Sequence, residues 1–189
     1  MDTIEALMTR VTHGALTDPP PDDAATRMLV EAAMRAPDHG RLRPWRFILI
    51  QGPARARFGE LMAGALRKRD PNASDVRVQQ ESAKALRAPA IMVVATRFNA
   101  ESRIPQVEQL LSAGAAAQNI LLAAHALGLG AAWKTGDAAY DATVKAGLGI
   151  NESDSVVAFI YLGSRSGASP PPSTVDPEQF LHRWQGKAA

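Results

Sequence analysis

The sequence predicts an α+β domain in which a central sheet is flanked by helices. Windows with apolar residues at helical spacing alternate with a few short runs of β-branched and apolar residues. The chain has 189 residues, 46% of them hydrophobic and 21% charged, which suits one core of ordinary size. Neither an internal repeat nor an interdomain linker breaks the pattern. We therefore expect a single domain over residues 1–189, with 164–189 as a C-terminal tail.

The first helix is predicted by its capping residues. Asp2 precedes the first periodic window and Glu5 follows at capping-box spacing, so residues 3–11 should be helical. The apolar side chains of this window share one face, formed by Ile4, Leu7, Met8 and Val11. A proline-rich connector over 18–21 follows.

The later elements are predicted by the same signals. Short apolar runs that end at Gly or Pro predict strands, and longer periodic windows predict helices. In chain order we expect a helix from Asp22 or Asp23 to just before Pro37, a buried strand over 45–51, a helix over 54–68, a strand over 90–96, a helix over 106–127, a strand over 131–134, a helix over 139–147 and a strand over 155–163. The polar stretch 69–88 is expected to be partly helical and mobile; it is a candidate lid, and none of its residues indicates what it would cover.

Two features point to contacts outside the central sheet. The run 112–117 in the long helix has only small side chains, which would let a helix of the same chain or of a partner approach closely. The polar tail carries a few large apolar residues that should dock on the chain's own core or on a partner: Val175, Phe180, Leu181 and Trp184.

Composition excludes several classes of protein. The chain has no cysteine, hence no disulfide, thiolate metal site or cysteine nucleophile. Its net charge is +2 without a dense basic stripe, which argues against a nucleic-acid binder. Residues 110–133 carry no formal charge, but their Ala, Gly and amide content favours a packed central helix over a membrane span. With no signal-peptide pattern at the N-terminus, we expect a cytoplasmic protein.

The segment 35–45 is the strongest functional signal. Its eleven residues hold three Arg, one His, one Asp and two Pro, and it joins a helix to an apolar strand. The prolines shape the backbone, so the cations and His39 should converge on an anionic or aromatic ligand. The alternative is ordinary: Arg35 complements the helix dipole and His39 lies on the surface. No matching metal ligands or nucleophile elbow accompany Asp38 and His39.

Three further motifs have both a functional and a structural interpretation. Arg10 and Thr12 could hold a phosphate, or they could be a solvated cation and a capping hydroxyl. The segment 133–136 could line a ligand, or it could be a strand end followed by a glycine turn. His125 lies in an apolar helix, where a core histidine is the more common case, and its segment lacks a Gly-x-Gly-x-x-Gly motif.

These motifs resemble the nitroreductase family, in particular a small single-domain branch. The resemblance is carried by Arg10-Val-Thr12, Ala36-Pro-Asp-His39 with Pro44-Trp45, and Gly128-Leu-Gly-Ala-Ala-Trp-Lys-Thr-Gly136. It extends from residue 1 to about residue 164. It implies a central mixed sheet flanked by helices, in a domain-swapped or intertwined homodimer that binds FMN between subunits.

The resemblance also implies which residues bind cofactors. FMN would be held by Arg10, Val11, Thr12, Arg35, His39, Trp133, Lys134 and Thr135. NAD(P) would contact Ala123, Ala124, His125, Ala126, Leu127 and Gly128. Val11 replaces a family cation and Lys134 replaces an Arg, so a charge is lost at one position and the forked donor at the other. Arg165 is a loosely aligned further cation for the phosphate.

The implied activity is transfer of electrons from NAD(P)H through FMN to a nitroaromatic, quinone or enone acceptor, by a ping-pong mechanism without a protein nucleophile. The alternatives are a flavin carrier or sensor that does not turn over NAD(P)H, and a flavin-cleaving or dehalogenating enzyme, which would usually carry a longer lid. We expect no metal, membrane or nucleic-acid partner.

Overall fold

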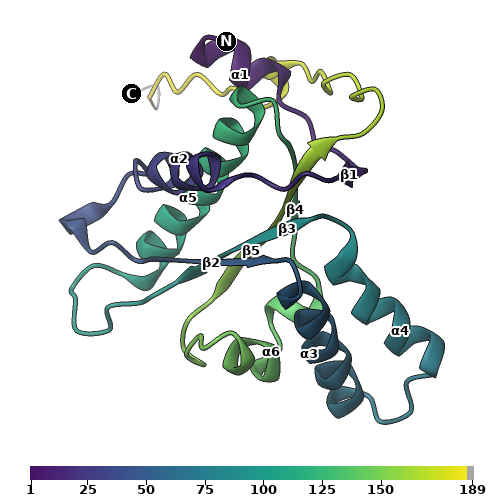
Figure 1. The fold of residues 1–189 in the computed structure, drawn as a ribbon. Coiled ribbons are helices and arrows are strands. Elements are labelled where there is room, and N and C mark those ends of the chain that lie inside the picture. Colours follow the sequence, from purple (N-terminus) through teal and green to yellow (C-terminus); the bar gives the residue numbers. More distant parts are fainter. Residues whose placement is uncertain (187–189) are drawn as a thin grey trace.

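The computed structural model describes residues 1–186 and is built on a five-stranded sheet (Figure 1). The strand order is β1-β5-β3-β2, and β4 also pairs with β5. The strands are β1 (Leu16–Thr17), β2 (Trp45–Gln51), β3 (Ala90–Thr96), β4 (Gly130–Lys134) and β5 (Val156–Arg165).

Every pairing in the described sheet is antiparallel, so the mixed sheet expected from the resemblance is wrong. The chain that leaves β2 passes through two helices and returns beside it in the opposite direction as β3. β5 then lies between β3 and β4 and runs against both, so that Ile160 is opposite Met92 on one side and Trp133 on the other.

Helices cover both faces of this sheet. Because successive strand residues point to opposite faces, β3 divides its side chains between two cores. Ile91 and Val93 pack toward α3 (Ala54–Arg69) and α6 (Ala142–Gly147), whereas Met92 packs toward the other face. The helices on that other face are α2 (Asp23–Ala33) and α5 (Gln106–Ala126). No helix among the described residues is long and apolar enough to cross a membrane.

The predicted capping box at the N-terminus is confirmed. The Asp2 carboxylate accepts a hydrogen bond from the Glu5 amide at 2.8 Å, and the Asp2 amide donates to the Glu5 carboxylate at 3.4 Å. Helix α1 (Thr3–Thr9) ends two residues earlier than expected because Arg10 is already extended. Its apolar face stays exposed in the single chain, with Ile4 at 68% and Met8 at 70% exposure.

The other predicted elements match with small shifts at their ends. β2 and β3 have the expected bounds, but β2 is an edge strand and Ile50 is its buried residue. The stretch 69–88 contains α4 (Asp75–Ala83), capped by Ser74, and a 3-10 turn, Lys84–Leu86. The expected helix over 139–147 is divided into a 3-10 turn, Asp137–Ala139, and α6. The short β1 was not expected.

The C-terminal tail is extended apart from a single turn, Pro177–Gln179. Its apolar side chains do not dock on the chain's own core: Phe180 is 73% and Trp184 90% exposed. The sequence predicted docking either on the chain's own core or on a partner. The structure rules out the first for these side chains, and docking on a partner stays a prediction. The last three residues of the expected tail, 187–189, lie outside the described residues.

Candidate functional site

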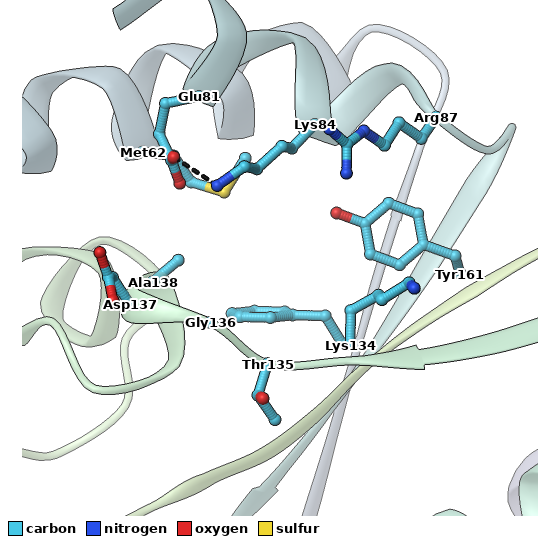
Figure 2. Close-up of a pocket in the computed structure, with 11 residues that line it drawn as sticks. Met62, Glu81, Lys84, Arg87, Lys134, Thr135, Gly136, Asp137, Ala138 and Tyr161 are labelled. Carbon is cyan, nitrogen blue, oxygen red and sulfur yellow. Dashed lines mark hydrogen bonds and ion pairs between the residues drawn. The ribbon is translucent and has the colours of Figure 1, made fainter. Parts of the chain in front are cut away.

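A cavity of about 190 Å³ lies where β4 ends (Figure 2). Its walls come from α3, from α4 and the turn that follows it, from the end of β4 and the 3-10 turn after it, and from the middle of β5. The lining residues are Met62, Glu81, Lys84, Arg87, Lys134, Thr135, Gly136, Asp137, Ala138, Phe159 and Tyr161. One wall thus comes from α3 and α4, two helices that the sequence analysis did not connect with a binding site.

This cavity presents unpaired positive charge. Lys84 is neutralised by Glu81, whose carboxylate lies 2.5 Å from the ammonium nitrogen. Arg87 and Lys134 have no ion pair or side-chain hydrogen bond within residues 1–186, and Figure 2 shows them on either side of Tyr161. Burial raises the pKa of Tyr161, so its hydroxyl stays neutral at pH 7. A ligand would therefore meet two cations and a neutral hydroxyl.

A second cavity, of about 240 Å³, adjoins the first. The two cavities share Arg87, Lys134 and Tyr161 as lining residues. The remaining walls of the second cavity come from Ala132 of β4, from His13 and Gly14 of the segment that joins α1 to β1, and from Leu16 of β1. The pair of cavities therefore leads from the end of β4 toward the N-terminal segment.

His13 is the buried polar residue of that segment. Its backbone amide donates to the Ala131 carbonyl at 3.1 Å, which ties the segment to β4. The side chain is 6% exposed; Nε2 lies 3.1 Å from the Ser169 hydroxyl, and Nδ1 has no partner. Burial lowers the pKa of His13, and the nearby charges of Arg165 and Arg10 lower it further. This segment is thus a cationic region with an unsatisfied buried nitrogen.

A directed chain of hydrogen bonds lies beside His13. Arg165 Nη2 donates to the His125 carbonyl at 2.9 Å and to His125 Nδ1 at 3.1 Å. Since Nδ1 then accepts, Nε2 carries the hydrogen and donates to the Thr9 hydroxyl at 2.9 Å. That hydroxyl donates to the Glu5 carbonyl at 2.6 Å. Burial lowers the pKa of His125, and the charge of Arg165 lowers it further, in keeping with a neutral ring.

The predicted phosphate residues lie at the end of α1. Arg10 is half-buried and Thr12 exposed, and neither side chain has a hydrogen-bond partner in the part of the chain that the structure describes. Val11, between them, is also half-buried. These residues directly precede His13, so the free cation of Arg10 and the orphaned nitrogen belong to one region.

The predicted ring-binding residues of β4 separate by strand alternation. Lys134 and Thr135 line the first cavity, although the Thr135 side chain points away from Glu81 in Figure 2. Trp133 packs against the core on the other face, with α2 and α5. Its contact with a ligand in the cavity would have to come from its backbone.

Arg35 and His39 lie elsewhere in the chain. Their segment is on the opposite side of the view from α3 and α4 in Figure 1, and neither residue lines the β4 cavities. His39 Nδ1 lies 2.6 Å from the Glu108 carboxylate in the first turn of α5, and the His39 side chain is 67% exposed. Within one chain, Arg35 and His39 therefore do not lie beside the other predicted FMN-binding residues at the β4 cavities.

The segment predicted to bind NAD(P), residues 123–128, ends α5. Ala124 and His125 are buried, and both nitrogens of the His125 ring bond within the protein. Ala123 and Ala126 line a groove of about 370 Å³ between α1, α2 and α5, together with Arg35. Leu127 and Gly128 are exposed at the helix end.

Sequence reasoning missed much of the wall around the first cavity. Lys84 and Arg87 stand three residues apart just before a buried strand, and that spacing was the available signal. Tyr161 lies in an apolar strand and could not be told from a core residue. His13 had no signal beyond its place next to Thr12.

Comparisons with known proteins identify the family of the chain. Residues 7–164 match the Nitroreductase family. The chain is 32% identical over 183 residues to YdjA of Escherichia coli K12, provisionally named an NAD(P)H nitroreductase, which covers 96% of this chain and 98% of YdjA.

Solved structures share the fold. A nitroreductase-like family protein from Bacillus cereus superposes with a TM-score of 0.86 at 22% identity, over 98% of this chain and 97% of the other. A provisionally named nitroreductase from Desulfovibrio desulfuricans, solved in complex with FMN, has a TM-score of 0.73 at 27% identity, over 95% of both chains. The chain belongs to the nitroreductase family, and by this homology it is an oxidoreductase.

Proposed function

We propose that this protein is an FMN-dependent oxidoreductase that passes electrons from NAD(P)H to an electrophilic acceptor in two successive half-reactions. The acceptor class is the one expected from the sequence, namely nitroaromatics, quinones or enones. The observation that carries the proposal is the pair of cations without partners, Arg87 and Lys134, that both adjoining cavities share. The second cavity also contains His13, whose Nδ1 atom has no hydrogen-bond partner.

The N-terminal segment 10–13, beside the second cavity, suits a phosphate. Arg10 offers a free guanidinium, Thr12 a free hydroxyl and His13 an unsatisfied buried ring nitrogen. Hydrogen bonds from charged donors to phosphate oxygens are among the strongest in proteins. Arg165 is already committed to His125 and Leu129, so we assign it to holding α5 and α1 in place beside the phosphate.

The β4 end suits the polar edge of a flavin ring. Bound FMN would supply the chemistry, by accepting a hydride at N5 and gaining negative charge at its N1–C2=O edge on reduction. Arg87 and Lys134 would face that edge and stabilise the added charge, and the Tyr161 hydroxyl would donate to an oxygen there. Met62 and Phe159 would supply apolar contact for the ring.

The remaining cofactor contacts would come from a second copy. Arg35 and His39 are exposed and distant from the β4 cavities, so they can complete the site of a partner. The exposed apolar face of α1 and the apolar tail around Trp184 offer surface for such a homodimer. A cytoplasmic location and NAD(P) contact at residues 123–128 remain parts of this proposal.

The first test is the visible spectrum of the purified protein with FMN, before and after anaerobic addition of NADH or NADPH. We expect a bound-flavin spectrum that bleaches with at least one of the two nucleotides. Bound flavin that stays oxidised with both would identify a carrier or sensor instead. Absence of flavin binding would overturn the proposal altogether.

A further inference from the structure

A third cavity, separate from the β4 cavities, lies between two loops next to His39. Its volume is about 530 Å³. One wall comes from the loop before β2 and the other from the loop after β3, through Leu42, Arg43, Arg97, Phe98, Asn99, Ala100 and Glu101. It shares no lining residue with the β4 cavities.

Two arginines give this cavity its charge. Neither the Arg43 nor the Arg97 guanidinium has an ion pair or hydrogen bond with any residue from 1 to 186. Glu101 is the acidic residue among those that line the cavity, and it forms no ion pair with either arginine. The lining therefore carries an excess positive charge with free forked donors, which match phosphate oxygens in geometry.

The first wall is held in an unusual backbone conformation. Arg41 and Arg43 have φ values of +54° and +50°, which residues other than glycine rarely adopt. The Asp38 carboxylate fixes this turn by accepting hydrogen bonds from the Leu42 amide at 3.1 Å and the Arg43 amide at 2.8 Å. Non-glycine residues in this region concentrate at functional sites, where the surrounding structure holds them.

The second wall is fixed by buried polar side chains. Gln109, 2% exposed, accepts a hydrogen bond from the Asn99 amide at 2.8 Å and donates to the Asn99 and Ile104 carbonyls. The Arg97 amide donates to the Pro44 carbonyl at 3.0 Å, which joins the two walls. The backbone on both walls is therefore fixed before a ligand binds, which lowers the entropy cost of ordering the loops.

From this arrangement we infer that Arg43 and Arg97 form a subsite for a phosphate group of the pyridine-nucleotide donor. The inference rests on the proposed function, which places His39, on the same loop as Arg43, beside the flavin of a partner. The flavin phosphate is assigned to Arg10, so the other phosphate-bearing ligand that approaches this flavin is the donor. A volume of several hundred Å³ suits a nucleotide fragment rather than a lone ion.

The test compares Arg43→Gln and Arg97→Gln, singly and together, with the FMN-loaded parent protein. Stopped-flow measurement of flavin reduction gives the apparent Kd for NADPH and for NADH. Each substitution should weaken binding about tenfold, since a charged hydrogen bond to phosphate is lost. An effect on NADPH alone would identify the 2′-phosphate, and an equal effect on both nucleotides the pyrophosphate. Arg103→Gln, an exposed arginine outside the cavity, is the matched control.

An unchanged Kd for both nucleotides in the double variant would overturn the subsite. If the protein fails to bind FMN, the proposed function fails, and the subsite is tested separately by titrating 2′,5′-ADP calorimetrically into the flavin-free protein. Binding that the double variant abolishes would support the subsite, and absence of binding by the parent protein would refute it.

Discussion

The β4 cavities and the loop region around His39 are built in contrasting ways. The β4 cavities are enclosed by helices, strands and turns of one chain, and their two unpaired cations, Arg87 and Lys134, line both cavities with the buried Tyr161. The loop region projects from the sheet, and its His39 and Arg43 are exposed. The first region has the features of a cofactor pocket in a single chain, whereas His39 of the second region lines neither β4 cavity. The difference fits the proposal that residues of a second copy complete the site.

The largest expected effect is at the proposed phosphate residues, which directly precede His13 of the second β4 cavity. Arg10→Ala should weaken FMN binding by about 1.5–3 kcal/mol, because a charged hydrogen-bond donor to phosphate is lost. That corresponds to about a 10- to 150-fold higher Kd, measurable by fluorescence titration of FMN. Arg57→Ala, an exposed cation of α3, should leave the Kd unchanged. Equal affinities for the Arg10 variant and the parent would remove Arg10 from the site.

A smaller effect is expected at the ring end. Arg87→Gln removes one of the two unpaired cations and should destabilise reduced flavin about tenfold relative to oxidised flavin. For a two-electron couple this lowers the midpoint potential by about 30 mV. Lys68→Gln, on the same side of the fold but outside the cavity, serves as control. If the midpoint potential of the Arg87 variant equals that of the parent protein, the polar edge of the flavin does not lie beside Arg87.

The loop region should respond through His39 and Glu108. The carboxylate of Glu108 can only accept, so the Nδ1 atom of His39 carries the hydrogen of this bond. In the neutral form of the ring, Nε2 then carries no hydrogen. Glu108→Ala should shift the ring toward the other tautomer and slow flavin reduction several-fold, whereas Glu108→Gln retains an acceptor and should rescue both. Nitrogen–proton correlation spectra report the tautomer directly. The same tautomer in the alanine variant would show that Glu108 does not position His39.

The smallest expected effect is a pH dependence of the flavin-free protein. Burial and neighbouring cations depress the pKa of His13 and His125 in the folded state, so the unfolded chain binds more protons as the pH falls through its value near 6.5. Stability should therefore decrease on acidification through that range. Bound FMN phosphate should reduce the decrease, because its charge favours protonated His13. Denaturant unfolding at several pH values, with and without FMN, measures both trends.

The fold was more predictable than the site. The bounds of β2 and β3 follow from uninterrupted apolar runs flanked by Gly or Pro, whereas α1 ends early because Arg10 turns away within a still-apolar pattern. The two-residue β1 is too short to produce a periodic signal. The sequence did not predict that Lys84 and Arg87 line the β4 cavities, because they lie in a turn after an ordinary polar helix. Only the tertiary fold brings them close to Lys134.

Which apolar segments stay exposed in the single chain could not be predicted from local pattern either. The apolar face of α1 has the periodicity of a core helix, but within one chain it faces solvent. The tail residues Phe180 and Trp184 have the same ambiguity.

The hydrogen-bond chain from Arg165 through His125 and Thr9 to Glu5 has one polarity along its whole length. Reversing any one of these hydrogen bonds would leave two donors or two acceptors facing each other. Arg165, at the end of β5, therefore holds the last turn of α1 in one orientation. Arg10 follows that turn directly. A substitution at Arg165 can therefore reduce cofactor retention from a distance, by loosening α1. Thr9→Val cuts the same chain without removing a cation, and it separates mechanical support of Arg10 from direct electrostatic attraction.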